Sequence, residues 1–218
     1  MRITKDADDR KNEILDVSGA LFSQKGFDAT TISDIIEKVG VARGTVYYHF
    51  KSKEDIMDAL IERYISRLLA AAKKIADDKS IPVFERFFQT LMVLVTDNDG
   101  SLEVTADDIH KPQNALMHQK MQKAMMEGIP PILAGIVEDG IKESLFDTPY
   151  PYETMEMAIA HTNTVFDNYS DNLTEKELVT KIKAFIFNLE RLFGTKAGSF
   201  DPVMRLFNID GNGTDEIC

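Results

Sequence analysis

The densest group of hydrogen-bond donors in the chain lies at residues 42–50, which read ARGTVYYHF. Arg43 can donate to a guanine edge or to a phosphate, and the polar atoms of Thr45, Tyr47, Tyr48 and His49 can donate to phosphate oxygens. Such a set points to contact with a nucleic acid. Structural alternatives remain open, because Tyr47 can belong to a small core and His49 can be a cation that the dipole favours at a helix C-terminus.

Small and basic residues surround these donors. Ala42 and Gly44 leave room for close approach to a partner, and Lys51 and Lys53 follow where a phosphate backbone would pass. Phe50 lies between the two groups, and we expect it mainly in a hydrophobic core. The stretch therefore combines donors, small residues and cations in the way that a reading helix requires.

Three helices are predicted to position this group. Residues 8–25 carry apolar side chains with a helical period. A short second helix runs from Thr31 to its glycine stop at Gly40, and Asp34 completes a capping-box-like pair with Thr31. The donors then fall on a third helix at residues 42–49. This is the layout of a helix-turn-helix, whose second helix enters the major groove.

The segment TTISDIIEKVGVARGTVYYHFKSKEDIMDAL, residues 30–60, resembles the DNA-binding signature of TetR-type transcriptional regulators. The resemblance extends back through LFSQKGF and covers about residues 10–60. The family usually has Ser where this chain has Ala42, so an N-cap oxygen is lost, and Ala where it has Ile36 and Val39. The matching positions are Thr31, Ile32, Asp34, Ile35, Gly40, Val41, Gly44, Thr45, Tyr47, His49, Phe50, Ser52, Lys53 and Glu54.

This resemblance implies a ligand-responsive repressor that binds a palindromic DNA operator as a homodimer. It implies that the last two long helices of each subunit form the dimer interface and that a small apolar or amphipathic effector, bound in the C-terminal body, releases the DNA. The apolar faces of those helices could instead be buried within one subunit. We predict DNA contacts from Thr31, Ser33, Ala42, Arg43, Gly44, Thr45, Tyr47, Tyr48, His49, Lys51 and Lys53.

The rest of the chain also has helical periodicity, so the predicted fold is all-α. A long helix, capped by Ser52, connects the N-terminal helix-turn-helix domain, here called the head, to the C-terminal domain, here called the body. We divide the chain into a helix-turn-helix domain (1–53), an effector-binding and dimerisation domain (54–207) and a disordered tail (208–218). Further helices are predicted at 81–96, 102–110, 113–146 with a kink or break at Pro130-Pro131, 153–169 and 175–193.

Soft, large side chains mixed with polar ones indicate an effector site in the body. Each of these residues could equally belong to an ordinary core. A metal site of His110, His118 and His161 with Asp107 or Asp108 is a weaker alternative, because no pair has tight helical ligand spacing; we expect no metal and no cofactor. The predicted effector contacts are Phe88, Met92, His110, Met117, His118, Met121, Met125, Asn163 and Phe166.

Composition narrows the function classes. The net charge is −11, yet residues 1–53 hold nine Lys/Arg against eight Asp/Glu, so the head escapes the acidity of the rest. No apolar run could span a bilayer, and the lone Cys218 excludes an internal disulfide. We expect a cytoplasmic protein.

No nucleophile elbow, Gly-rich phosphate loop or Cys–His pair indicates an enzyme. A helical interaction module that does not bind DNA remains the alternative, and salt dependence separates the two.

Overall fold

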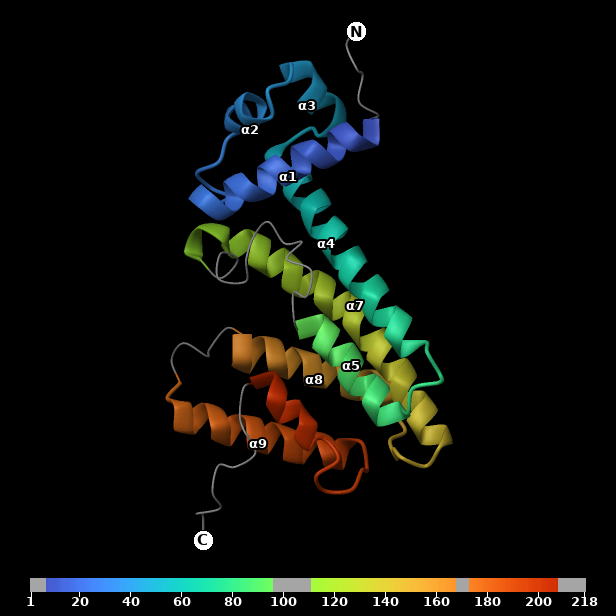
Figure 1. Cartoon of the computed structure of the whole chain (residues 1–218). Helices are drawn as coiled ribbons and strands as arrows, with labels where there is room; N and C mark the ends of the chain where they lie inside the picture. The colour runs from blue at the N-terminus through green and yellow to red at the C-terminus, as the bar shows by residue number, and fades with distance from the viewer. Residues whose placement is uncertain (1–6, 96–110, 168–172, 208–218) are drawn as a thin grey trace. The chain divides into compact units, whose positions relative to one another are not determined.

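The structure is a computed structural model that describes residues 7–95, 111–167 and 173–207. All regular elements in these ranges are helices, which confirms the predicted all-α fold. The chain divides into two compact units, residues 1–67 with 97–125 and residues 68–96 with 126–218. Helices α4 (Lys53–Ala76) and α7 (Ala115–Lys142) each begin in the first unit and end in the second (Figure 1).

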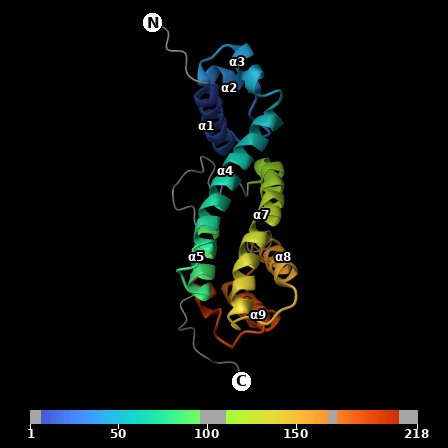
Figure 2. The same ribbon diagram turned by 90° about the vertical axis from the view of Figure 1, so that its right-hand side faces the viewer.

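The first unit contains the predicted helix-turn-helix. Helix α1 (Ala7–Lys25) packs against α2 (Ile32–Val39), and α3 (Arg43–His49) follows after a short turn (Figures 1 and 2). Each helix contributes apolar side chains to one small core. The fully buried members are Ile14, Phe22, Ile35, Val46, Ile56 and Met57.

Local sequence explains where α2 and α3 begin and end. The Thr31 hydroxyl accepts the Asp34 N–H at 3.1 Å, and the Asp34 carboxylate accepts the Thr31 N–H at 2.7 Å, so the predicted capping box is confirmed. Gly40 ends α2 in the left-handed conformation, at φ 73°. Ala42 gives α3 no side-chain cap. Hydrogen bonds from the Thr31 backbone and from Lys25 lower the pKa of Asp34 to about 2, so the capping carboxylate stays charged.

The second unit is held together by phenylalanines. Helix α5 (Val83–Val95) lies in this unit with α8 (Pro151–His161) and α9 (Glu175–Leu192), and the chain continues into η4 (Asp201–Phe207). The fully buried Phe200 lies at the centre, with its ring centroid 5.4 Å from that of Phe87 and 5.6 Å from that of Phe193. Further rings around it are Phe84, Phe88 and Phe146.

Helix α7 continues through Pro130-Pro131 without a break, where the prediction was a kink or a break. Burial of nearby side chains such as Ile129 and Leu133 offsets the lost backbone hydrogen bonds. Three other features differ from the sequence prediction. Helix α8 starts at Pro151, earlier than the predicted residue 153, since proline suits the first turn. It gives way to a π-helical segment, η2 (Thr162–Asp167), whereas η4 was not predicted at all.

Two predicted elements, the helix at 102–110 and the tail at 208–218, lie outside the described residues. The functional domain limits at 53 and 207 stay a prediction. Of the helices in the described ranges, none is both long and apolar enough to span a membrane.

Phe200→Ala should lower the free energy of unfolding by about 3–5 kcal/mol, because it leaves a cavity among buried rings. Urea denaturation at fixed protein concentration measures this change. Tyr150→Ala in the same unit is the control: Tyr150 is 64% exposed, so its loss should shift the free energy by less than about 0.5 kcal/mol. Equal effects of the two substitutions would contradict the aromatic core.

Candidate nucleic-acid interface

Helix α3 divides its side chains into a buried anchor and an exposed donor face. Val46 is fully buried and Phe50 is 4% exposed, which confirms that Phe50 belongs to the core. Arg43 lies on the exposed face, where Tyr47 is 39% exposed and Tyr48 is 80% exposed. A tyrosine exposed to this degree makes little contribution to the core, so the face is available to a partner.

Contacts along α3 orient the donors without covering them. The Arg43 guanidinium lies 5.3 Å from the Tyr47 ring centroid, and Arg43 Nη2 is 3.4 Å from the Tyr47 hydroxyl. The Tyr48 ring meets the edge of His49 with centroids 5.0 Å apart. These ring contacts restrict the rotamers of the exposed side chains, which reduces the entropy lost when they bind.

Small residues leave the start of α3 open. A Cβ added at Gly44 would meet no atom of the protein within 4 Å, apart from its chain neighbours and its own helix backbone. Ala42 is exposed, and Thr45 is half-buried. Lys51 follows the helix with an exposed side chain, while its N–H donates to Asp55 at 2.9 Å. A phosphate backbone could therefore approach the backbone of α3 closely.

The other predicted DNA contacts have structural roles as well. The Thr31 hydroxyl bonds to Asp34 at 2.8 Å within the capping box, whereas Ser33 is simply exposed. Lys53 Nζ donates to the Phe27 carbonyl at 2.6 Å and lies 4.2 Å from the Phe27 ring centroid. Lys53 thus braces the turn between α1 and α2, and its predicted DNA contact stays a prediction.

A buried hydrogen bond that sequence reasoning missed ties this turn to the start of α7. The Phe27 N–H donates to Asn114 Oδ1 at 2.8 Å, and Asn114 is fully buried. Gly26 precedes it at φ 84°, and a Cβ there would collide with the side chain of Gln113. Only Gly26 was recognisable in sequence, as a helix stop. Its partner lies 87 residues away, in the short helix η1 (Pro112–Asn114).

The predicted effector contacts fall into two groups. Four lie on α7 in the first unit, where Met117 and Met121 are buried and His118 and Met125 are half-buried. Phe88, Met92, Asn163 and Phe166 lie in the second unit, and His110 lies outside the described residues, so neither unit contains the full set. In that unit Phe88 is half-buried and Met92 exposed on α5, and Asn163 and Phe166 are half-buried in η2.

Most residues of the alternative metal site lie outside the described part of the chain. His110, Asp107 and Asp108 lie outside the described residues. Within residues 7–95, 111–167 and 173–207, no three His, Cys, Asp or Glu side chains come together as metal ligands.

Two models of one family match the chain. Residues 14–60 match the bacterial regulatory proteins of the tetR family, and residues 99–187 match the tetracyclin repressor-like C-terminal domain. Together they cover more than half of the 218 residues. The chain belongs to the TetR family. This assignment confirms the resemblance found in residues 10–60, and it extends that resemblance into the body.

Individual relatives of this TetR-family chain are regulators. The HTH-type transcriptional repressor KstR2 of Mycobacterium tuberculosis is 33% identical over 82 residues, or 38% of this chain. That match spans only 41% of the relative's length. A putative TetR-family regulator from Mesorhizobium loti superposes with a TM-score of 0.61 at 18% identity, covering 87% of this chain and 98% of that one.

A third relative was solved with a ligand. The regulator FadR of Bacillus subtilis, in complex with stearoyl-CoA, has a TM-score of 0.52 at 21% identity. The match covers 84% of this chain and 97% of FadR. At these identities the two solved structures establish a common fold, namely that of the helical TetR-family regulators.

Asn114→Ala should expose the Phe27 amide to exchange, because the buried N–H then has no acceptor in the side chain. Hydrogen exchange followed by NMR should show much faster exchange at Phe27. The Gly40 amide, which donates to the Ile36 carbonyl at 3.0 Å within the head, is the internal control and should keep its rate. Unchanged exchange at Phe27 would show that Asn114 does not hold the turn.

Proposed function

We propose that this TetR-family chain is a DNA-binding transcriptional regulator whose α3 enters the major groove. The division of α3 carries this proposal, since Val46 and Phe50 anchor the helix while Arg43, Tyr47 and Tyr48 are exposed. The N-terminal residues of a recognition helix lie nearest the base edges. Arg43, Gly44 and Thr45 occupy that position here.

The operator is expected to be a palindrome. A homodimer with twofold symmetry presents two copies of α3, and two symmetric half-sites match them. We propose repression as the mode of action, because the KstR2 relative is a transcriptional repressor. A regulator that binds chromosomal DNA acts in the cytoplasm, where we place this chain.

The dimer interface is proposed on α8 and α9, which lie side by side in the second unit (Figure 1). The His161 ring stacks on Phe185 at 5.2 Å, which joins the two helices. Large apolar side chains nevertheless remain exposed on them: Met157 is 59% exposed and Phe187 is 52% exposed. Burying these side chains against a second copy would stabilise a dimer through the hydrophobic effect.

We propose an apolar or amphipathic effector that releases the DNA. The body offers methionines and phenylalanines, which make adaptable binding surfaces. The FadR relative was solved with stearoyl-CoA, an amphipathic molecule with a long acyl chain. The predicted contacts Phe88, Met117 and Met121 remain candidates for the apolar part.

Purified protein should select a palindromic fragment from genomic DNA, and Arg43→Ala should bind that fragment about 10- to 100-fold more weakly. A contact to phosphate would also lower the salt slope by about 1 for each subunit, whereas a contact to a base edge would relax specificity at that position. Lys196→Ala removes the same charge from an exposed position in the second unit and should bind normally. Failure to enrich any fragment at low or moderate salt would instead favour the interaction module.

Phe187→Glu should convert the dimer to a monomer, because it places a charge in the proposed apolar interface. Size-exclusion chromatography with light scattering should give twice the chain mass of 24.5 kDa for the wild type and the single mass for the variant. Asn188→Glu adds the same charge at the neighbouring exposed position and should remain dimeric. A monomeric wild type would contradict the proposed interface.

A further inference from the structure

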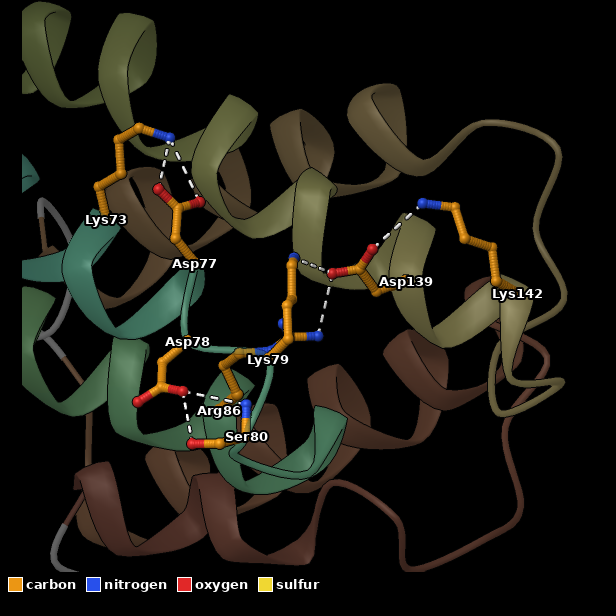
Figure 3. A network of polar contacts seen from close by, with 8 residues as sticks. All are labelled: Lys73, Asp77, Asp78, Lys79, Ser80, Arg86, Asp139 and Lys142. Carbon is orange, nitrogen blue, oxygen red and sulfur yellow. Dashed lines mark hydrogen bonds and ion pairs between the residues drawn. The ribbon is translucent and has the colours of Figure 1, made fainter.

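Three cations share one carboxylate in the second unit (Figure 3). Asp139 of α7 accepts from Arg86 Nη2 at 3.0 Å and from Lys142 Nζ at 3.1 Å, and it also pairs with Lys79. The lysine side chains are 61% and 72% exposed, so water can solvate them. The Arg86 side chain is only 2% exposed. Of these three cations, Arg86 is therefore the one whose charge is shielded from water.

Most of the Arg86 guanidinium has no acceptor in the part of the chain that the structure describes. A guanidinium carries five N–H donors, and Nη2 bonds to Asp139, but no protein atom of the described residues accepts from Nε or Nη1, which are both buried. Thr90, one helical turn along α5, is fully buried, and its hydroxyl likewise has no partner among the described residues. Buried donors without acceptors are rare, because each one has lost its hydration without compensation.

A second carboxylate that senses the charge of Arg86, that of Asp78, is hydrogen-bonded to Ser80. Asp78 lies close enough for the charge of Arg86 to contribute to lowering its pKa, after larger effects from hydrogen bonds with Ser80. Its Oδ1 accepts the Ser80 N–H at 3.0 Å and the Ser80 hydroxyl at 2.6 Å (Figure 3). An ion pair between α5 and α7 accounts for one nitrogen of Arg86, and it leaves the other two nitrogens and Thr90 unexplained.

Buried apolar residues flank Arg86 along α5. Phe87, the next residue on α5, is 1% exposed, and its ring centroid lies 6.1 Å from that of Phe88. Val83, one turn before Arg86, is also buried. A low-dielectric setting strengthens a charge-assisted hydrogen bond. Polar donors beside aromatic side chains are what a site for an amphipathic molecule needs.

We infer that Arg86 and Thr90 bind an anionic oxygen, of a carboxylate or a phosphate, at the polar end of an amphipathic alkyl effector. The guanidinium donates through Nε or Nη1 and the Thr90 hydroxyl donates beside it, while the alkyl part packs beside the phenylalanines of α5. This inference rests on the proposed function, because it assigns effector binding to the second unit. It names the chemical group that the effector carries.

Calorimetric titration of the full-length protein tests the inference with three probes that share one alkyl chain. Dodecanoate and dodecyl phosphate carry the two candidate anions, and dodecanol is their uncharged match. At least one anion should bind about 10- to 100-fold more tightly than dodecanol, the range expected for hydrogen bonds to charged groups. The anion that binds identifies the source, since the two are titrated separately.

Variants then locate the contact. Arg86→Met should abolish the preference for the anion and leave dodecanol binding unchanged, whereas Thr90→Val should weaken anion binding by a few-fold. Lys142→Met is the matched control: it also removes a cation from Asp139, but the lysine is solvated, so anion binding should persist. Circular dichroism and the thermal midpoint verify folding, and Thr90→Val decides the question if Arg86→Met does not fold.

Three results would overturn the inference: dodecanol binding as tightly as both anions, neither anion binding, or a folded Arg86→Met variant with wild-type preference. Because DNA is absent from the titration, these outcomes are independent of DNA binding. Selection of DNA fragments by Arg86→Met should succeed as it does for the wild type. Failure of that selection in both proteins would count against the proposed regulator and not against the anion site.

Discussion

The hydrogen bond from the Phe27 amide to Asn114 fixes the turn on which the helix-turn-helix depends. This turn joins α1 to α2, so its position determines where α3 is presented. Asn114 immediately precedes α7, and α7 continues into the second unit, where its Asp139 pairs with Arg86 of α5. One continuous helix thus connects the support of the DNA-binding head to the site where we place the effector anion.

The acidity of the chain does not oppose this account. Residues 54–218 carry a net charge of −12 and the head carries +1, which together give the −11 of the whole chain. Charges more than about 8–10 Å from a phosphate are largely screened at physiological salt. We therefore expect the local donors of α3 to govern contact with DNA, and the Tyr47 ring orients Arg43.

Local rules explain what sequence could predict. The capping box of Thr31 with Asp34 depends on residues three apart and forms as expected, and Thr174 with Glu177 forms a second box by the same local rule. The buried roles of Asn114 and Arg86 could not be predicted, because their partners lie far along the chain. An isolated Asn or Arg is expected at the surface. The unbroken α7 shows tertiary burial overriding a local rule for proline. The effector contacts stay a prediction, since composition alone cannot show which distant residues come together.

Hydrogen–deuterium exchange of the protein, free and bound to its selected DNA fragment, tests the central claim most directly. If α3 enters the groove, peptides covering residues 43–49 should gain protection on DNA. The α1–α2 turn around Phe27 should gain protection as well, because DNA would stabilise the arrangement that Asn114 holds. Protection confined to α8 or α9, with none at residues 43–49, would contradict the account and place the DNA contact elsewhere.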